Sequence, residues 1–352
     1  MDARWQDGGK RPLHGLPHLG QHSSRERVHA APLWVCRIVG NANGARTEWH
    51  QKEALVADER EQGSGRASRT VRGELYEEHL TLGVSFDRAE DTGLAYPASY
   101  AREQPLDLAL EGAVISDLTG ATYRLVSGAH PQELCEAAFC ARKLRVGQCA
   151  FEPALTGDGA ITSVALLART GTHEYVLLDP TRRGSVVAGW LTFLSQVSSN
   201  GNAPYEGTSV EEASGMLVPL LIMGARANEL LADYLPSAAR ALPARGAVES
   251  VTLDGHIPAL LVGMPVDIAG GVPAYVLLVP KTAARVMWRS LLSFTWVEPV
   301  GRTAVLGTWS QLPWAQRLDS TDVVEIAEQD LRAWGLLRRG NDFVGARGIL
   351  EG

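Results

Sequence analysis

The sequence predicts an α+β fold with two related lobes, each an antiparallel sheet with helices packed on one face. The first observation is that the order strand, helix, three strands, helix occurs twice, within residues 122–197 and again within residues 216–292. The second is that the strands are short and joined by tight turns, which favours antiparallel pairing over the parallel crossovers of a doubly wound sheet. We therefore place the lobes at about 94–200 and 210–350.

The first lobe carries clear signals for where its elements begin and end. Pro131 suits the first turn of a helix, because the N–H that proline lacks has no partner there. The string at 157–159, Gly-Asp-Gly, is typical of a hairpin turn between two apolar runs. Val186, Trp190 and Leu194 recur at helical spacing on one face. The expected elements are a strand at 122–128, a helix at 130–140, strands at 149–155, 161–168 and 175–178, and a helix at 185–197.

A polar linker at 198–209 leads to a second lobe with the same logic. Its apolar run at 257–280 is long enough to cross a bilayer, but several prolines and Asp267 interrupt it. A bilayer offers no water to the backbone groups that such residues free, so two buried strands joined by a turn explain the run better. We expect no membrane contact. The expected elements are a strand at 216–223, a helix at 225–234, strands at 248–253, 257–262 and 274–279, and a helix at 282–292.

Residues 1–75 differ in character from the rest of the chain. They show no sustained period and are rich in Arg, Gly, His and Ser. Such a composition cannot bury a core, so we expect a disordered tail at 1–75 and one compact domain at 76–352. The whole chain of 352 residues is 45% hydrophobic and 21% charged, as in an ordinary soluble protein.

Charge and cysteine content exclude several classes of function. The net charge of -7 argues against a nucleic-acid-binding protein, which usually has a basic domain. No apolar secretory segment opens the chain, so we expect a cytoplasmic protein. Cys135, Cys140 and Cys149 do not have the spacing of a common zinc or iron–sulfur site. Together with Cys36 they are expected to be buried thiols in a reducing compartment, with no metal.

Several strings, in this order along the chain, resemble the glycine-cleavage T-protein (aminomethyltransferase) family. The resemblance covers roughly residues 94–350 and implies a folate-binding domain with a central cavity between the lobes, tetrahydrofolate as cofactor, and one-carbon transfer as activity. A flat apolar ligand with few polar anchors would suit such a cavity. The strings are Asp117-Leu118-Thr119 with Ser127-Gly128, the hairpin at 151–161, the segment at 223–231, the strand at 275–280, the turn at 307–314, and Asp342-Phe343-Val344-Gly345.

The acidic pair of the family is missing from this sequence. The resemblance places that pair directly after the hairpin, where one carboxylate is thought to act on the folate amine, and here Ser163 and Val164 stand at those positions. Neither side chain can hold a charge or relay a proton as a tuned carboxylate does. Asp158 lies five residues earlier and is the remaining candidate for a catalytic carboxylate, although a turn aspartate ordinarily closes its own hairpin.

The residues that the resemblance assigns to folate binding are also altered. Val272 stands where the family has a glutamate that grips the pterin edge, and Asp267 replaces it only if the loop is shifted. Arg302, followed by Thr303, is one place out of register with the family's arginine, and in a strand one place reverses the face. We therefore expect Arg302 to face solvent more readily than to clamp a ligand.

Arg302, Trp309 and Asp117 are nevertheless the candidate cofactor-binding residues. A flat ligand ring stacks well on a tryptophan side chain. Alternatively, the tryptophans in the last third of the sequence form part of a core between the lobes. These tryptophans are Trp288, Trp296, Trp309, Trp314 and Trp334.

These substitutions favour a protein related to tetrahydrofolate-dependent one-carbon transfer whose catalysis is lost or altered, with tetrahydrofolate bound weakly or not at all. The family continues past the string at 342–345 into a barrel domain, and the sequence ends at Gly352, so a second subunit would have to supply the barrel. One alternative is a non-catalytic ligand-binding protein or a partner subunit of a one-carbon or demethylase complex. Another is the iron–sulfur assembly relative, which has a cysteine in the string that aligns with 342–345, where this chain has none.

Overall fold

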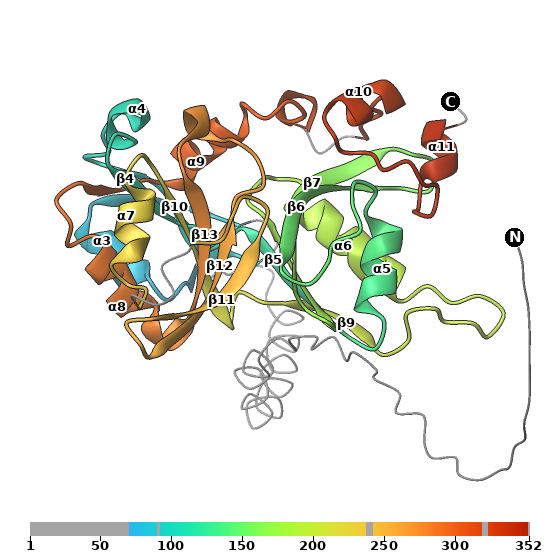
Figure 1. Ribbon diagram of the computed structural model, residues 1–352, viewed down its shortest axis with the longest axis horizontal. Coiled ribbons are helices and arrows are strands. Elements are labelled where there is room, and N and C mark those ends of the chain that lie inside the picture. Colours follow the sequence, from blue (N-terminus) through green and yellow to red (C-terminus); the bar gives the residue numbers. More distant parts are fainter. Residues whose placement is uncertain (1–69, 90–91, 237–241, 319–322, 351–352) are drawn as a thin grey trace, which may run out of the picture.

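The computed structural model describes residues 70–350 apart from 90–91, 237–241 and 319–322. Two sheets pack face to face, and helices cover the outer face of each, so the chain forms four layers (Figure 1). The α+β class with helices on one face of each sheet is as predicted. Within the described residues, no helix is long and apolar enough to span a bilayer.

The five-stranded sheet comes from the first lobe, and its strands lie in the order β6-β7-β8-β5-β9 with antiparallel pairing throughout. Its outer face packs against α5 and α6. The elements are β5 (Thr122–Gly128), α5 (Pro131–Ala138), β6 (Gln148–Leu155), β7 (Ile161–Gly171), β8 (Glu174–Asp179), α6 (Gly184–Ser195) and β9 (Thr208–Glu212).

The six-stranded sheet has the order β11-β12-β13-β10-β4-β14, and β4 joins it from a position in the sequence before the five-stranded sheet begins. β4 pairs antiparallel with β10 and parallel with β14. The elements are β4 (Ala113–Asp117), β10 (Leu217–Met223), α7 (Ala227–Ala232), β11 (Val248–Leu253), β12 (Ile257–Gly263), β13 (Ala274–Pro280), α8 (Lys281–Leu291) and β14 (Val297–Pro299).

Strand alternation divides the apolar side chains between the layers. Along β7, Val164 and Leu166 belong to the cluster between the two sheets, whereas Ala165 and Leu167 belong to the cluster beneath α5 and α6. Successive strand residues point to opposite faces, so a strand that is buried on both sides must be apolar nearly throughout. The residues of β7 from 161 to 169 are all buried, and those from 164 to 168 are all apolar.

A small third sheet lies beside the six-stranded sheet, with the order β1-β3-β2. His79 connects the two through a buried chain of hydrogen bonds. Its Nε2 lies 2.9 Å from Asp117 Oδ2, and its Nδ1 lies 2.8 Å from the Tyr100 hydroxyl. The elements are β1 (Val71–Arg72), α3 (Tyr76–Thr81), β2 (Val84–Arg88), β3 (Leu94–Tyr100) and α4 (Leu106–Ala109).

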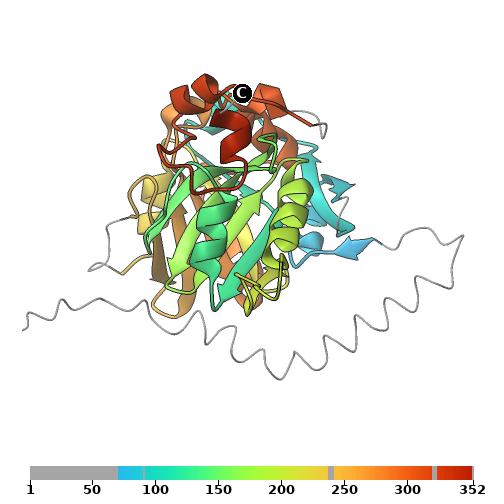
Figure 2. The same cartoon turned by 90° about the vertical axis from the view of Figure 1, so that its right-hand side faces the viewer.

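The C-terminal segment crosses one end of the two-sheet stack, as both views show (Figures 1 and 2). Gly345, with φ of +88°, lets the chain pass close to the β6–β7 hairpin, because a Cβ there would lie 2.5 Å from the carbonyl oxygen of Thr156. The elements are α9 (Arg302–Trp309), η3 (Ala315–Leu318), α10 (Glu328–Ala333) and α11 (Ala346–Leu350).

The strands and helices predicted between 122 and 292 are all present, with boundaries shifted by a few residues. The linker prediction was wrong at its end, because residues from 208 form the edge strand β9. The strand assumed around Arg302 was also wrong, since α9 begins there. Most of the predicted tail, residues 1–69, lies outside the described residues; Leu75 is described and is fully buried.

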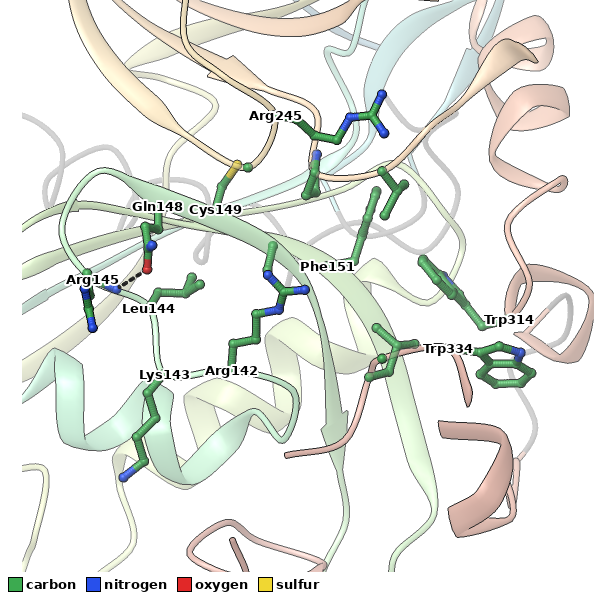
Figure 3. A pocket seen from close by; sticks show the side chains of 16 residues that line it. Arg142, Lys143, Leu144, Arg145, Gln148, Cys149, Phe151, Arg245, Trp314 and Trp334 are labelled. Carbon is green, nitrogen blue, oxygen red and sulfur yellow. Dashed lines mark hydrogen bonds between the residues drawn. The ribbon is translucent and has the colours of Figure 1, made fainter. Parts of the chain in front are cut away.

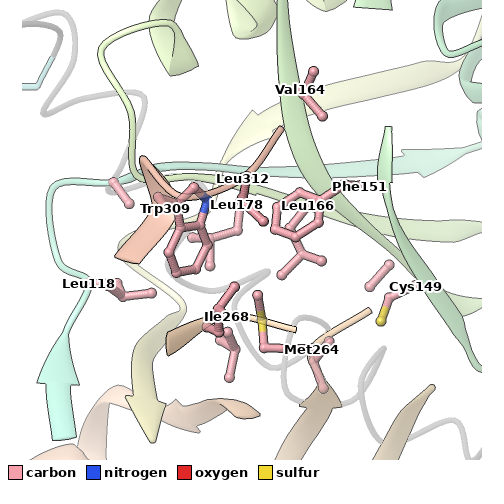
Figure 4. Close-up of a cluster of buried hydrophobic side chains, with 14 of the residues drawn as sticks. Leu118, Cys149, Phe151, Val164, Leu166, Leu178, Met264, Ile268, Trp309 and Leu312 are labelled. Carbon is pink, nitrogen blue, oxygen red and sulfur yellow. The ribbon is translucent and has the colours of Figure 1, made fainter. Parts of the chain in front are cut away.

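Phe151 provides a test of the packing between the sheets. Its ring packs against those of Trp309 and Trp314, with ring centroids 6.0 and 5.5 Å away, and Figure 4 shows Phe151 together with Trp309. We expect Phe151→Ala to lower the free energy of unfolding by about 3–5 kcal/mol, because a buried cavity would remain. Phe193→Ala is the control: this side chain on α6 is 61% exposed and its loss should cost less than about 1 kcal/mol. Equal effects in urea denaturation would contradict this assignment of the core.

Candidate functional site

A cavity of about 600 Å³ opens where the margins of the two lobes meet the C-terminal segment (Figure 3). The middle of the space between the sheets is filled by side chains such as Phe151, Leu166 and Met264 (Figure 4), so the predicted cavity between the lobes lies off centre. Both lobes and the C-terminal segment supply its lining. The residues are Arg142, Lys143, Leu144, Arg145, Gln148, Cys149, Ala150, Phe151, Arg245, Gly246, Pro265, Val266, Trp314, Trp334, Gly335 and Leu336.

The segment at 140–147, between α5 and β6, forms the basic wall of the cavity. The Cys140 N–H donates to the Pro153 carbonyl at 3.1 Å, which ties the start of the segment to β6. The next two N–H groups, of Ala141 and Arg142, both donate to Glu152 Oε2. Backbone hydrogen bonds therefore fix the start of the segment, and its charged side chains are exposed at the cavity.

The four basic side chains of the lining differ in how they are engaged. Arg245 forms an ion pair with Asp267, and Lys143 contacts carboxylate oxygens of Glu136 and Asp342 at 3.0 and 2.5 Å. The guanidinium groups of Arg142 and Arg145, by contrast, make no hydrogen bond or ion pair with the described residues. These two groups are available to an anion.

Aromatic rings line the wall that faces the C-terminal segment. Phe151 comes from β6, Trp314 follows α9, and Trp334 ends α10. Trp314 is buried against Phe151, whereas Trp334 is only partly buried (Figure 3). Tryptophan offers a large flat apolar face, so this wall suits a planar ligand.

Glu152 lies directly behind the basic wall and is fully buried. Burial raises the pKa of its carboxyl to about 8, although the two N–H donors and the charges of Arg338 and Arg142 act in the opposite direction. The sequence analysis did not single out this residue. A glutamate flanked by alternating apolar residues in a strand is the signal that would have found it.

The two positions that the resemblance assigns to an acidic pair do not line the cavity. Ser163 points to the helix side of its sheet and donates to Asp179 Oδ2 at 2.5 Å, while Val164 lies in the packed space between the sheets (Figure 4). Asp179, which sequence reasoning missed, is fully buried and accepts two further hydrogen bonds from Thr181. Burial raises the pKa of Asp179, and these bonds oppose the rise.

Arg302 is buried rather than solvent-facing, so that expectation was wrong. It opens α9, and its guanidinium donates to the carbonyl of Pro180 at 3.0 Å and to that of Gly120 at 2.8 Å. The same group lies 4.4 Å from the centroid of the Tyr96 ring. Arg302 thus joins α9 to both sheets and does not line the cavity.

The other predicted site residues are also apart from the cavity. Asp117 accepts from His79 and, at 2.9 Å, from the Thr119 N–H. Trp309 packs edge-on against Phe151 in the space between the sheets. Asp158 is exposed in the hairpin turn and accepts a hydrogen bond from the Thr156 hydroxyl, which lowers its pKa. Their roles in ligand binding stay predictions.

Removing the Arg302 side chain tests its role in joining the layers. Arg302→Ala should lower the free energy of unfolding by about 2–4 kcal/mol, because buried carbonyl groups lose a charged donor. Arg332→Ala is the matched control, since this exposed arginine pairs with Glu328 on the same helix and should change stability by less than about 0.5 kcal/mol. Urea denaturation measures both, and equal effects would refute the structural role of Arg302.

Comparisons with known proteins support the fold alone. No protein-family model and no curated protein matches the chain. Among solved structures, the glycine cleavage system aminomethyltransferase T from Bartonella henselae superposes with a TM-score of 0.62 at 20% identity, covering 80% of this chain and 74% of that one. A heterotetrameric sarcosine oxidase from Corynebacterium sp. U-96 matches with a TM-score of 0.37 at 13% identity, covering 64% and 94%. The predicted resemblance is thus confirmed for the architecture, and the chain has the fold of the glycine-cleavage aminomethyltransferase T-protein.

Proposed function

We propose that this chain is a ligand-binding protein with the aminomethyltransferase fold, which takes a planar anion into the cavity and does not transfer an aminomethyl group. The observation that carries the proposal is the pairing of two unengaged guanidinium groups, Arg142 and Arg145, with an aromatic wall in one cavity. The volume of about 600 Å³ is that of a typical small-molecule site.

The chemistry of the lining favours a carboxylate, sulfonate or phosphate attached to a flat ring. Guanidinium groups bind such oxyanions through paired hydrogen bonds of fixed geometry. Trp314 and Trp334 would receive the ring, because offset stacking on tryptophan adds to the burial of apolar area. Lys143 and Arg245 already have acidic partners, so they contribute positive potential more than direct contacts.

Tetrahydrofolate does not fit the positions at which the resemblance would bind it. Val164 fills part of the packed space between the sheets, and Val272 packs against the same cluster. Neither can accept the hydrogen bonds of a pterin, and the hydroxyl of Ser163 is directed to Asp179. We therefore expect tetrahydrofolate to bind weakly or not at all.

Acid–base catalysis has no support in the lining of the cavity. The described residues that line it include no aspartate or glutamate. Glu152 and Asp179 are buried within the layers, and Asp267 is paired with Arg245. General acid–base catalysis requires a group within hydrogen-bond reach of the reacting atom.

Two further expectations from the sequence stay predictions. One is a second subunit that supplies a barrel, and the other is a cytoplasmic location.

Anion binding is tested with naphthalene-1,5-disulfonate, a planar dianion, by calorimetry at pH 7. We expect saturable 1:1 binding that the double variant Arg142→Ala/Arg145→Ala weakens at least tenfold, because each charge-assisted contact contributes about 1.5–3 kcal/mol. The double variant Arg226→Ala/Arg332→Ala changes the net charge equally at two positions outside the cavity lining and should bind as the wild type does. Equal loss in both doubles, or no binding, would contradict the proposed site.

Aminomethyl transfer is tested by release of ammonia and methylene-tetrahydrofolate from an aminomethyl-loaded carrier protein. The purified chain should give no turnover above the uncatalysed rate, since no carboxylate of the described residues lines the cavity. Turnover that Asp158→Ala abolishes would refute this expectation and identify Asp158 as the catalytic carboxylate. Turnover that survives this substitution would equally contradict the loss of activity.

A further inference from the structure

Glu152 binds the backbone of the segment that carries the basic wall of the cavity. Its Oε2 accepts the N–H of Ala141 at 3.0 Å and the N–H of Arg142 at 3.2 Å. Its Oε1 is equally buried and has no hydrogen-bond partner among the described residues. One oxygen thus fixes two consecutive peptide groups at the start of this segment, while the other is left without the donor that a buried carboxylate oxygen needs.

An unpartnered, fully buried carboxylate oxygen is costly when charged and much less so when it carries a proton. Glu152 forms no ion pair with a residue that the structure describes. Arg338 of the C-terminal segment donates instead to the carbonyls of Glu136, Phe139 and Asp342 and to the Asp342 carboxylate. From α5 and the segment after it, Glu152 faces the neutral thiols of Cys135 and Cys140, whose pKa values burial raises.

Arg142 is the charged group that belongs both to this environment and to the cavity. Its N–H binds Glu152, and its guanidinium lines the cavity wall. We propose that Glu152 is a positioning residue for the cavity, and that its ionisation weakens the binding of an anion at Arg142. The proposal rests on the proposed function, because it concerns the regulation of the same anion site.

The direction of this effect follows from the negative charge of ionised Glu152 and the positive charge of Arg142. Protonated Glu152 still accepts both N–H bonds and adds no negative charge behind Arg142, whereas ionised Glu152 competes with a bound anion for the positive potential of that group. Anion binding and proton binding therefore favour each other, and this coupling is reciprocal. Since the pKa of Glu152 is about 8, affinity for an anion should fall as the pH rises from 7 to 9.5.

Other groups at the cavity do not titrate in this range. Arginine and lysine stay protonated, and Lys143 has a raised pKa because Asp342 and Glu136 accept its hydrogen bonds. Burial raises the pKa of the Cys149 thiol to about 12, so it stays neutral. Asp342 and Asp267 have lowered pKa values and stay ionised. A pH dependence between 7 and 9.5 therefore reports on Glu152.

The experiment measures the affinity for naphthalene-1,5-disulfonate, whose sulfonates stay ionised, by calorimetry between pH 6.5 and 9.5. The wild type should lose threefold to tenfold in affinity across this range. Glu152→Gln keeps the shape and a hydrogen-bond acceptor but cannot ionise, so its affinity should stay flat and exceed that of the wild type at pH 9.5. Glu174→Gln is the matched control: Glu174 is a buried carboxyl in the same sheet, with a pKa raised by burial, and this variant should keep the wild-type profile.

The outcomes separate the two proposals. Binding at pH 6.5 with the same decline in Glu152→Gln would overturn the coupling and leave the anion site standing. Absence of binding at any pH would overturn both. The wild type alone supplies a second readout if Glu152→Gln does not fold: at pH 8, binding should take up a fraction of a proton, seen as an enthalpy that depends on the buffer. A binding enthalpy that is the same in every buffer would show that no proton is taken up, and this result would overturn the coupling.

Discussion

The packing of one sheet against the other is the constraint on which the rest of this structure depends. Phe151, Leu166 and Met264 fill the space between the sheets, and helices cover both outer faces. Each central strand is therefore buried on two sides and has almost no place for a charged group. A polar side chain in such a strand usually has a hydrogen-bond partner in a neighbour, as Asp179 has in Thr181 and Ser163.

Because of this constraint, polar side chains and the cavity lie away from the space between the two sheets. The buried carboxyls of Glu152 and Asp179 point to the helix layers, where each accepts hydrogen bonds from the backbone. The space between the sheets is apolar and is filled by residues such as Val164. A small molecule can therefore approach only where loops replace strands, and the cavity lies at such a place.

The C-terminal segment completes the lining of the cavity. It crosses the end of both sheets (Figure 2), brings Trp314 and Trp334 opposite Arg142, and is itself fixed by Arg338, which donates to three backbone carbonyls. Charge and flat apolar surface thus come from different parts of the chain and meet only after folding. The proposed recognition of an anion rests on this combination, and the described residues that line the cavity include no aspartate or glutamate.

The order of strands and helices was determined by the sequence itself, because period and turn residues act over a few neighbours. Pro131 and the turn at 157–159 mark boundaries that the structure keeps. Arg302 was misplaced because its strand was assumed from an alignment, whereas the helix that it opens is selected by packing across both sheets. Only the tertiary structure decided the position of the cavity, because residues almost two hundred positions apart in the sequence line it. The raised pKa of Glu152 was likewise decided by the tertiary structure, because it results from burial by residues distant in the sequence. Local patterns carry no information on either, because both are properties of what surrounds a side chain in space.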